Sequence, residues 1–206
     1  MKIALFDKHL YEEIYLERER QKYDYKLNCF ETRLNSKTAQ LAKDHEVVCC
    51  FVNDELNRET LTLLADQGTK LIALRSAGFS HVDLDAAEEL GLDVVRVPEY
   101  SPYAVAEFAA TLLLTVNRKI HRSYTRAREM NFSLEGLEGF DLNNKTVGII
   151  GTGKIGSKFA KIMWGFGCQI LAFDQYHNKE ITEQFNAKYC KSLEEIYEKA
   201  DVISLH

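Results

Sequence analysis

Three glycines and one aspartate have the types and spacing that hold a dinucleotide. Gly151, Gly153 and Gly156 form the pattern G-x-G-x-x-G directly after a short apolar run at 146–150. A helical pattern follows, and Asp174 closes the next apolar run, 18 residues after the last glycine. This order of strand, glycine loop, helix, strand and acid is the context in which a glycine triplet indicates a dinucleotide site.

Each of these residue types has a physical role. Gly151 allows a tight turn, Gly153 lets a pyrophosphate approach the backbone, and Gly156 lets the helix pack close to the strand. The helix N-terminus offers unpaired N–H groups and a partial positive charge to phosphates. Asp174 can accept hydrogen bonds from both ribose hydroxyls and would repel a 2′-phosphate, and no Arg stands at 175–178, so NAD is expected rather than NADP. The alternative is a glycine-rich turn with an ordinary strand-end aspartate.

The composition argues against several kinds of binding partner, among them nucleic acid, a membrane and a metal ion. Of the 206 residues, 46% are hydrophobic, enough for a true core, and the net charge of −5 without a basic tract argues against nucleic acid. No apolar run approaches the roughly 18 residues that a membrane span needs, and the N-terminus resembles no signal peptide, so a cytoplasmic location is expected. The five cysteines include no C-x-x-C pair, which favours reduced thiols over disulfides or a metal site.

Residues 1–99 are predicted to form one small α/β domain, because short strands alternate with helices. The expected strands are 2–6, 25–30, 47–52, 71–74 and 93–97, and the expected helices are 9–20, 34–42, 58–66 and 83–90. This pattern indicates a parallel, doubly wound sheet with helices on both faces. The predicted strand order is the flavodoxin-like 2-1-3-4-5.

Residues 100–206 are predicted to form the first half of a Rossmann dinucleotide-binding domain. A helix is expected from Ser101 to about Thr125; it is apolar most of the way round, which indicates burial between domains or subunits. The apolar run 202–205 counts as the third strand of the sheet. On that count the strand at 146–150 lacks a neighbour on one side. We therefore expect that both domains lack C-terminal segments and that the second domain stops after its third strand.

A second candidate site follows the fourth predicted strand. The loop 75–83 lies at the carboxyl end of a parallel strand, where open α/β sheets bind ligands. Successive N–H groups around Ala77 and Gly78 could bind an anion. An ordinary turn with Asp83 as the next helix cap is an equal alternative. Tyr100 could direct its hydroxyl toward a cleft between the domains, although on its own it is more typical of a packed aromatic.

His206 is of the type that transfers protons near neutral pH. On the strand count above it ends the third strand, far from the nicotinamide half of NAD, and it has no evident carboxylate partner. Lys154, inside the glycine loop, is expected near phosphate rather than in the chemistry. The sequence therefore offers no catalytic residue.

Several segments in order resemble the D-2-hydroxyacid dehydrogenase family, most closely the NAD-dependent branch that forms D-lactate. They are LIALRSAGFSHVDLDAAEELGLDVVRVPEYSPYAVAE, NFSLEGLEGFDL, GKIGSKFA after GTG, and the final ADVISLH. The resemblance covers residues 1–206. It implies a substrate domain followed by an NAD domain with Asp174 as the ribose acid, and a homodimer built partly on the helix that starts at Ser101. It also implies reversible hydride transfer between NADH and pyruvate or a similar small 2-keto acid.

By the same resemblance, the expected substrate-binding residues are Ala77, Gly78 and Tyr100, and Lys154 and Ile155 occupy cofactor-loop positions. The Arg and the Glu–His pair that perform catalysis in the family are expected beyond residue 206, so we expect no NADH-dependent reduction of pyruvate by this chain alone. One alternative is another acid substrate, such as glycerate or a larger keto acid. The other is a catalytically inactive fragment or an NAD-binding, corepressor-like protein.

Overall fold

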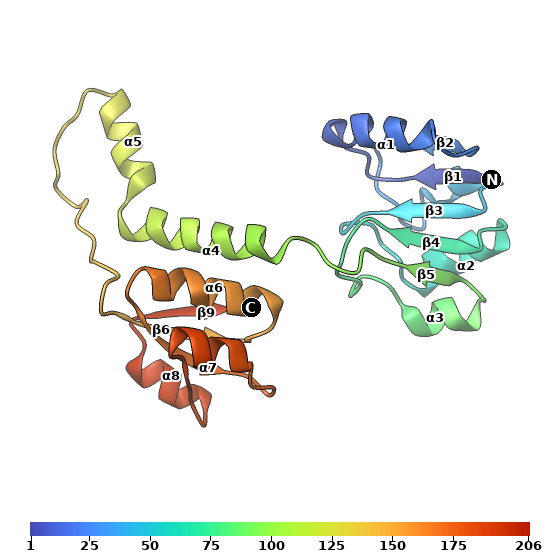
Figure 1. Cartoon of the computed structure of the whole chain (residues 1–206). Coiled ribbons are helices and arrows are strands. Elements are labelled where there is room, and N and C mark those ends of the chain that lie inside the picture. The colour runs from blue at the N-terminus through green and yellow to red at the C-terminus, as the bar shows by residue number, and fades with distance from the viewer. The chain divides into compact units, whose positions relative to one another are not determined.

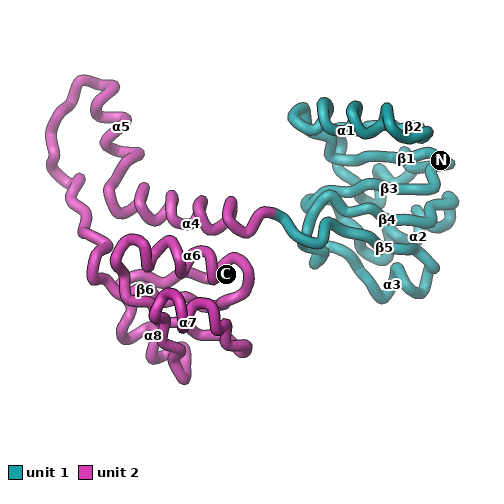
Figure 2. The backbone as a smooth tube through the Cα atoms, viewed as in Figure 1, with its two compact units in different colours: residues 1–100 teal, residues 101–206 magenta.

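The chain, described over all 206 residues by a computed structural model, divides into two units after Tyr100. Unit 1 comprises residues 1–100 and unit 2 residues 101–206 (Figure 2). Each unit has its own sheet and its own core of buried apolar residues, and each is described separately below.

Unit 1 is built on five parallel strands in the order β2-β1-β3-β4-β5 (Figure 1), which confirms the predicted flavodoxin-like order. The strands are β1 (Lys2–Leu5), β2 (Lys26–Cys29), β3 (Val47–Cys50), β4 (Leu71–Leu74) and β5 (Asp93–Val95). Short apolar runs such as VVCC and LIAL suit central parallel strands, because both faces of such strands can be covered. All carboxyl ends of these strands therefore lie at one edge of the sheet.

Three of the five helical segments of unit 1, the α-helices α2 (Arg58–Asp66) and α3 (Leu84–Glu89) and the short 3₁₀ segment η2 (Ala39–Ala42), cover one face of this sheet. The other two are the short 3₁₀ segment η1 (Leu10–Glu12) and the α-helix α1 (Glu13–Arg20). Side chains of α2, α3 and η2 form the core together with alternate strand residues such as Val48 and Ile72.

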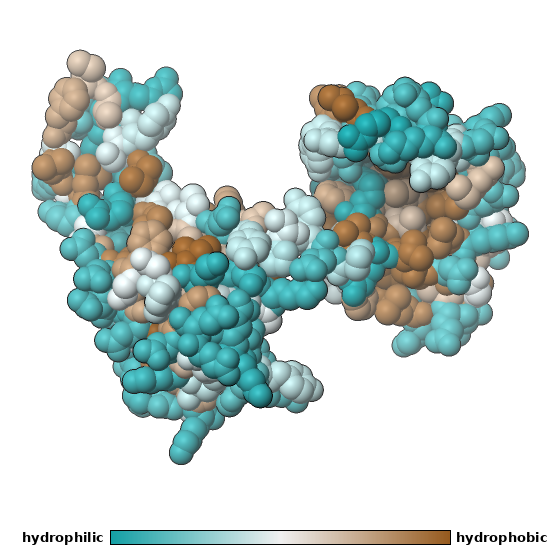
Figure 3. Space-filling view, in the orientation of Figure 1, coloured by the Kyte–Doolittle hydropathy of each residue, from teal (hydrophilic) through white to brown (hydrophobic).

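The opposite face of the unit 1 sheet is only partly covered, since Leu5 and Val47 are buried there whereas Val95 is 51% exposed. Helix α1 buries none of its residues and lies near Leu27 and Cys29 of the edge strand β2. The space-filling view shows a broad apolar surface on this unit (Figure 3). The expectation of helices on both faces is thus met only at one edge of this sheet.

Unit 2 contains four parallel strands in the order β8-β7-β6-β9. Its elements are α4 (Pro102–Asn117), α5 (Ile120–Arg128), β6 (Thr146–Ile150), α6 (Lys154–Gly165), β7 (Gln169–Phe173), α7 (Lys179–Phe185), β8 (Lys188–Tyr189), α8 (Leu193–Lys199) and β9 (Val202–Leu205). Helices α4 and α6 pack on each other, and Ile196 of α8 lies against Gly148 of β6.

The last strand of the chain is not the third strand of this sheet. Strand β9 pairs with β6, from Val147 beside Val202 to Ile150 beside Leu205. The third strand is β8, which pairs with β7 and has only two residues, too few to show a periodic pattern. The prediction that β6 has an open edge is therefore wrong: β6 lies between β7 and β9 and is an interior strand.

The helix that starts after Ser101 is shorter than predicted. It ends at Asn117, and Lys119 adopts a left-handed conformation (φ 52°) before α5 starts in a new direction. Asn117 explains the break, because its side chain donates a hydrogen bond to the carbonyl of Phe140 (2.7 Å) and accepts one from the N–H of Phe140 (2.9 Å). This contact ties the end of α4 to the loop that precedes β6.

The structure contains no helix that is both long and apolar enough to cross a membrane. It also contains no cluster of three or more His, Cys, Asp or Glu side chains arranged to hold a metal ion.

Candidate functional site

The three glycines between β6 and α6 differ in what surrounds them. A Cβ on Gly151, whose φ is +92°, would lie 2.2 Å from the carbonyl oxygen of His206. A Cβ on Gly156 would lie 2.0 Å from the carbonyl oxygen of Gly151. A Cβ on Gly153 would meet no atom within 4 Å. Packing inside the protein thus explains the first and third glycines, whereas the second leaves open space in which a ligand can approach the backbone.

The N-terminus of α6 faces this open space. Gly153 is its N-cap and has no side chain to bond the first-turn N–H groups. These N–H groups and the helix dipole favour an anion at this position. Lys154 is exposed at the start of the helix, whereas Ile155 packs against the core, so the two cofactor-loop positions predicted by resemblance have different surroundings.

Asp174 lies at the end of β7, next to the glycine loop. Its Oδ2 accepts hydrogen bonds from the N–H (2.5 Å) and the hydroxyl (3.1 Å) of Thr152, the residue between the first two glycines. Its Oδ1 accepts from the N–H of Tyr176 at 3.1 Å. The N–H of Thr152, then that of Tyr176, hold the pKa of the Asp174 carboxyl below its usual value, so the carboxylate is ionised at neutral pH. The structure therefore brings the predicted acid and the glycine loop together.

His206 lies elsewhere than predicted. Its N–H donates to the carbonyl of Ile150 (2.9 Å), because it follows β9, the neighbour of β6. Its ring packs against Phe159 of α6 with centroids 5.0 Å apart, and its Nε2 is 2.9 Å from Oγ of Ser204. Burial lowers its pKa. The prediction that His206 lies far along the sheet is wrong, since its backbone contacts the glycine loop. The sequence does not reveal strand β8, and without β8 the last strand counts as the third of the sheet.

Ala77 and Gly78, in the loop after β4, are held in place by hydrogen bonds to their carbonyl groups. The hydroxyl of Ser76 donates to the carbonyl of Gly78 (2.8 Å), and the guanidinium of Arg96 donates to the carbonyl of Ala77 (3.0 Å). None of the hydrogen bonds of the loop uses the N–H of either residue. Two successive N–H groups are thus available to an anion at the carboxyl edge of the sheet. Asp83 caps α3 through the N–H of Ala86, so the cap predicted as the alternative is also present. Tyr100, at the end of unit 1, is 69% exposed.

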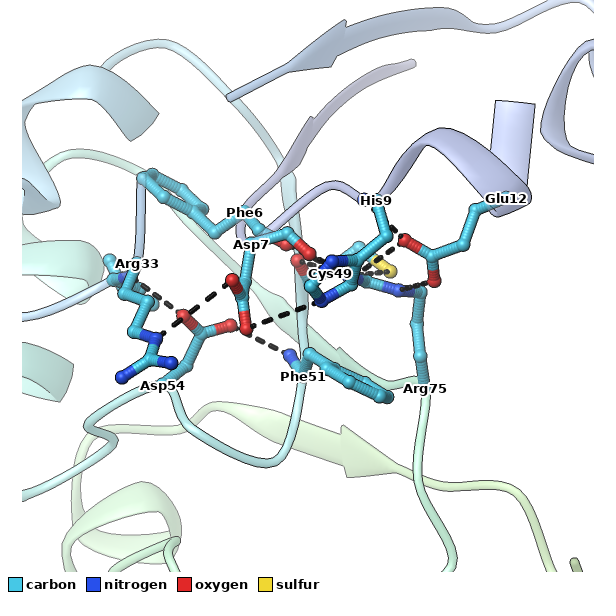
Figure 4. A network of polar contacts seen from close by, with 10 residues as sticks. Phe6, Asp7, His9, Glu12, Arg33, Cys49, Phe51, Asp54 and Arg75 are labelled. Atoms are coloured by element: carbon cyan, nitrogen blue, oxygen red, sulfur yellow. Dashed lines mark hydrogen bonds and ion pairs between the residues drawn. The ribbon is translucent and has the colours of Figure 1, made fainter. Parts of the chain in front are cut away.

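Sequence reasoning gave no role to Arg75, which links three strand ends (Figure 4). Its guanidinium donates to the carbonyl groups of Phe6 (3.0 Å) and Asp7 (2.9 Å), which follow β1, and to that of Cys49 (3.4 Å) in β3. It also forms an ion pair with Glu12 at 2.9 Å, and both side chains are mostly buried. Arg75 directly precedes the Ser76–Gly78 loop and so fixes where that loop starts.

Asp54 performs a similar task beside Arg75. Its carboxylate accepts hydrogen bonds from the N–H groups of Leu34 and Phe51, both at 2.7 Å. Burial raises the pKa of this carboxyl. These contacts hold the loop after β3 against the rest of the edge, so the surroundings of the Ala77–Gly78 loop are fixed by polar groups from several strands.

Comparison with known proteins identifies a family for this chain of two parallel α/β units. Residues 3–205 match the family described as "D-isomer specific 2-hydroxyacid dehydrogenase, catalytic domain". Because the match extends over nearly the whole chain, the chain belongs to this family.

Two curated relatives and two solved structures illustrate the similarity. The chain is 51% identical to a 2-hydroxyacid dehydrogenase homolog of Haemophilus influenzae and 48% identical to D-lactate dehydrogenase of Escherichia coli, in each case over 100% of this chain and 62% of the relative. The apo-structure of D-lactate dehydrogenase from Escherichia coli has a TM-score of 0.91, at 48% identity and covering 100% of this chain and 65% of that one. D-lactate dehydrogenase from Aquifex aeolicus, solved with NAD and lactic acid, has a TM-score of 0.85, at 31% identity and covering 99% and 60%. The chain thus spans about three fifths of the length of these relatives.

Proposed function

We propose that this chain supplies the NAD-binding unit and the substrate loop of an enzyme that transfers hydride reversibly between NADH and pyruvate or a similar small 2-keto acid. The observation that carries the proposal is the space beside Gly153, bordered by the uncapped start of α6, with an ionised Asp174 next to the same loop. In this assignment residues 1–99 are the substrate domain and residues 100–206 the NAD domain.

The residues present fit NAD. Its pyrophosphate would lie at the N-terminus of α6, between Gly151 and Gly156, and its adenosine ribose at Asp174. An ionised carboxylate favours ribose hydroxyls and opposes a 2′-phosphate, so NAD is expected to bind more tightly than NADP. The relative from Aquifex aeolicus, solved with NAD, supports this choice.

The carboxylate of the keto acid would bind the open N–H groups of Ala77 and Gly78, with Tyr100 lining the pocket. A carboxylate is the kind of anion that a backbone concavity accepts. Bound NADH supplies the hydride. The residues described here bind and orient the two reactants, and we assign none of them to proton transfer. A second acid substrate of the same class, such as glycerate or a larger keto acid, would use the same anion site.

The alternative of a catalytically inactive, NAD-binding corepressor receives no support from the curated relatives, which are named dehydrogenases. We further propose that the protein works in the cytoplasm, which fits five unpaired cysteine thiols, and that its partner is a small 2-keto or 2-hydroxy acid rather than nucleic acid.

Replacing Asp174 by alanine tests the cofactor site. Asp174→Ala is expected to lower the affinity for NADH about tenfold or more, because charge-assisted hydrogen bonds to the ribose are lost. Isothermal titration calorimetry of the purified protein measures this. Asp141→Ala, at a side chain that is 92% exposed, is the control and should bind NADH as the unchanged protein does. Equal NADH affinity in the Asp174→Ala and unchanged proteins would refute the ribose assignment.

We also propose that α4 forms part of a homodimer interface. Phe108, Leu112 and Val116 stand at four-residue intervals on this helix and are 63%, 50% and 62% exposed, so they form one apolar stripe. Apolar side chains reach the surface over this helix in Figure 3. A stripe of this kind is typical of an interface with another protein surface.

Phe108→Glu is therefore expected to convert a dimer into a monomer, since it places a charge within the apolar stripe. Size-exclusion chromatography with light scattering gives the mass. Tyr197→Glu, at a 55% exposed aromatic residue of α8, serves as the control and should remain dimeric. A monomeric unchanged protein, or a dimeric Phe108→Glu variant, would contradict the proposed interface.

A further inference from the structure

A chain of hydrogen bonds runs behind Asp174 through residues to which no role has yet been given. The hydroxyl of Thr152 lies 3.1 Å from Oδ2 of Asp174 and 2.7 Å from the hydroxyl of Tyr189. The N–H of Asn178 donates to that Tyr189 hydroxyl at 2.7 Å. The chain thus extends from the start of α7, through β8, to the ribose acid at the end of β7.

The direction of this chain is fixed by the number of protons. An ionised carboxylate only accepts hydrogen bonds, so the single hydroxyl proton of Thr152 points to Asp174. The oxygen of Thr152 must then accept the proton of Tyr189. The oxygen of Tyr189 in turn accepts the N–H of Asn178, which can only donate. Every donor points toward Asp174, which stabilises its negative charge.

The residues of this hydrogen-bond chain are held in place by further contacts. Thr152 is 2% exposed, and its carbonyl accepts a hydrogen bond from Nδ2 of Asn178 at 3.2 Å. The side-chain oxygen of Asn178 accepts the N–H of Glu180 and so caps α7. The ring of His177 stacks on that of Tyr189, with centroids 3.9 Å apart and planes 11° apart. The Tyr189 hydroxyl therefore has little freedom to turn elsewhere.

We propose that Tyr189 and Thr152 are positioning residues that set the orientation of the Asp174 carboxylate toward the adenosine ribose of NAD and thereby its preference for NAD over NADP. This inference rests on the proposed function. The N–H and the hydroxyl of Thr152 occupy both lone pairs of Oδ2. A ribose hydroxyl is consequently directed to Oδ1, the oxygen bonded to Tyr176 rather than to Thr152.

The hydroxyl groups can be removed without changing the shape of the side chains. Tyr189→Phe keeps the stack with His177, and Thr152→Val keeps the buried volume of Thr152 while removing its hydroxyl. Thr152→Ser restores the hydroxyl and is the matched rescue variant. Tyr197→Phe, at an exposed tyrosine of α8, is the control for removing a tyrosine hydroxyl. Thermal unfolding of each variant establishes that it is folded.

Calorimetric titration with NADH and NADPH provides the readout. Tyr189→Phe is expected to weaken NADH binding about fivefold, Thr152→Val about tenfold, and Thr152→Ser less than twofold, from the usual free energies of single hydrogen bonds, of which only that of Thr152 is to a charged group. NADPH affinity should not fall with them, so the preference for NADH decreases by the same factors. A role in structure alone would weaken both nucleotides equally, and that result would overturn the inference.

A double-mutant cycle separates this inference from the proposed function. In the Asp174→Ala background, Tyr189→Phe should have no further effect on NADH affinity, since the group it orients is gone. A full, additive loss there would show that Tyr189 acts by another route and would overturn the inference. If Asp174→Ala weakens NADH binding while Tyr189→Phe and Thr152→Val do not, only the positioning role fails. If Asp174→Ala itself has no effect, the proposed cofactor site fails.

Discussion

Gly153→Ala is expected to reduce NADH affinity about tenfold or more while it changes the free energy of unfolding by about 1 kcal/mol or less. No atom of the protein lies within 4 Å of the added methyl group, so the fold has room for it. That room is the space through which the pyrophosphate would approach the backbone. A methyl group there keeps the phosphates away from the N–H groups of α6.

Gly156→Ala is the opposite case on the same loop. Its methyl group would lie 2.0 Å from the carbonyl oxygen of Gly151, which is backbone and cannot swing away. We expect a loss of about 2–3 kcal/mol of unfolding free energy together with the loss of NADH binding. Gly165→Ala, near the end of the same helix and with no atom within 4 Å, is the control and should be neutral or stabilising by up to about 1 kcal/mol.

Urea denaturation and NADH titration of these three variants measure the two effects separately. If Gly153→Ala binds NADH as tightly as the unchanged protein, phosphate does not approach at this glycine. If Gly156→Ala is as stable as Gly165→Ala, the close contact between α6 and the loop is not part of the folded state in solution.

Arg75→Met is expected to cost about 3–5 kcal/mol of unfolding free energy, because it leaves Glu12 as a buried, unpaired charge. The two side chains are 13% and 14% exposed. The carbonyl groups of Phe6, Asp7 and Cys49 also lose a donor. Arg75→Lys should recover only part of the loss, since one ammonium group cannot reproduce a planar guanidinium with donors in several directions.

Arg58→Met is the matched control for this prediction. Arg58 also pairs with a glutamate, Glu89, but the two side chains are 53% and 63% exposed, so solvent screens the pair and the loss of unfolding free energy should be small compared with that of Arg75→Met. Urea denaturation followed by circular dichroism gives both values, and amide hydrogen exchange in β1 and β3 localises the effect. Similar losses in Arg58→Met and Arg75→Met would show that the network in Figure 4 does not hold the strand ends together.

Sequence reasoning succeeded where local pattern and chain topology agree. The apolar runs 47–52 and 71–74 contain the strands β3 and β4, and short alternation with helices requires a parallel sheet. The glycine loop between β6 and α6, and the position of Asp174 beside it, could be predicted because both depend on spacing along the chain. The same pattern predicts the strand order of the first sheet, β2-β1-β3-β4-β5.

It failed where distant contacts decide the structure. Strand β8 has two residues and exists only because it pairs with β7, so no window of sequence reveals it. The break between α4 and α5 has no Gly or Pro signal and depends on Asn117 bonding Phe140, 23 residues away. Tyr189 is an ordinary aromatic residue in the sequence, and only the fold brings its hydroxyl to Thr152.

The pairing of β6 with β9 has a consequence for how the chain acquires its structure during synthesis. About fifty residues separate the two strands, so the pairing is among the slow, non-local steps of folding. Until β9 arrives, β6 presents an open edge that can pair with another chain. The backbone of His206 also lies against Gly151, so the glycine loop gains one of its walls only in that same late step. A newly made chain thus exposes the edge of β6 in the same interval in which its glycine loop is still incomplete.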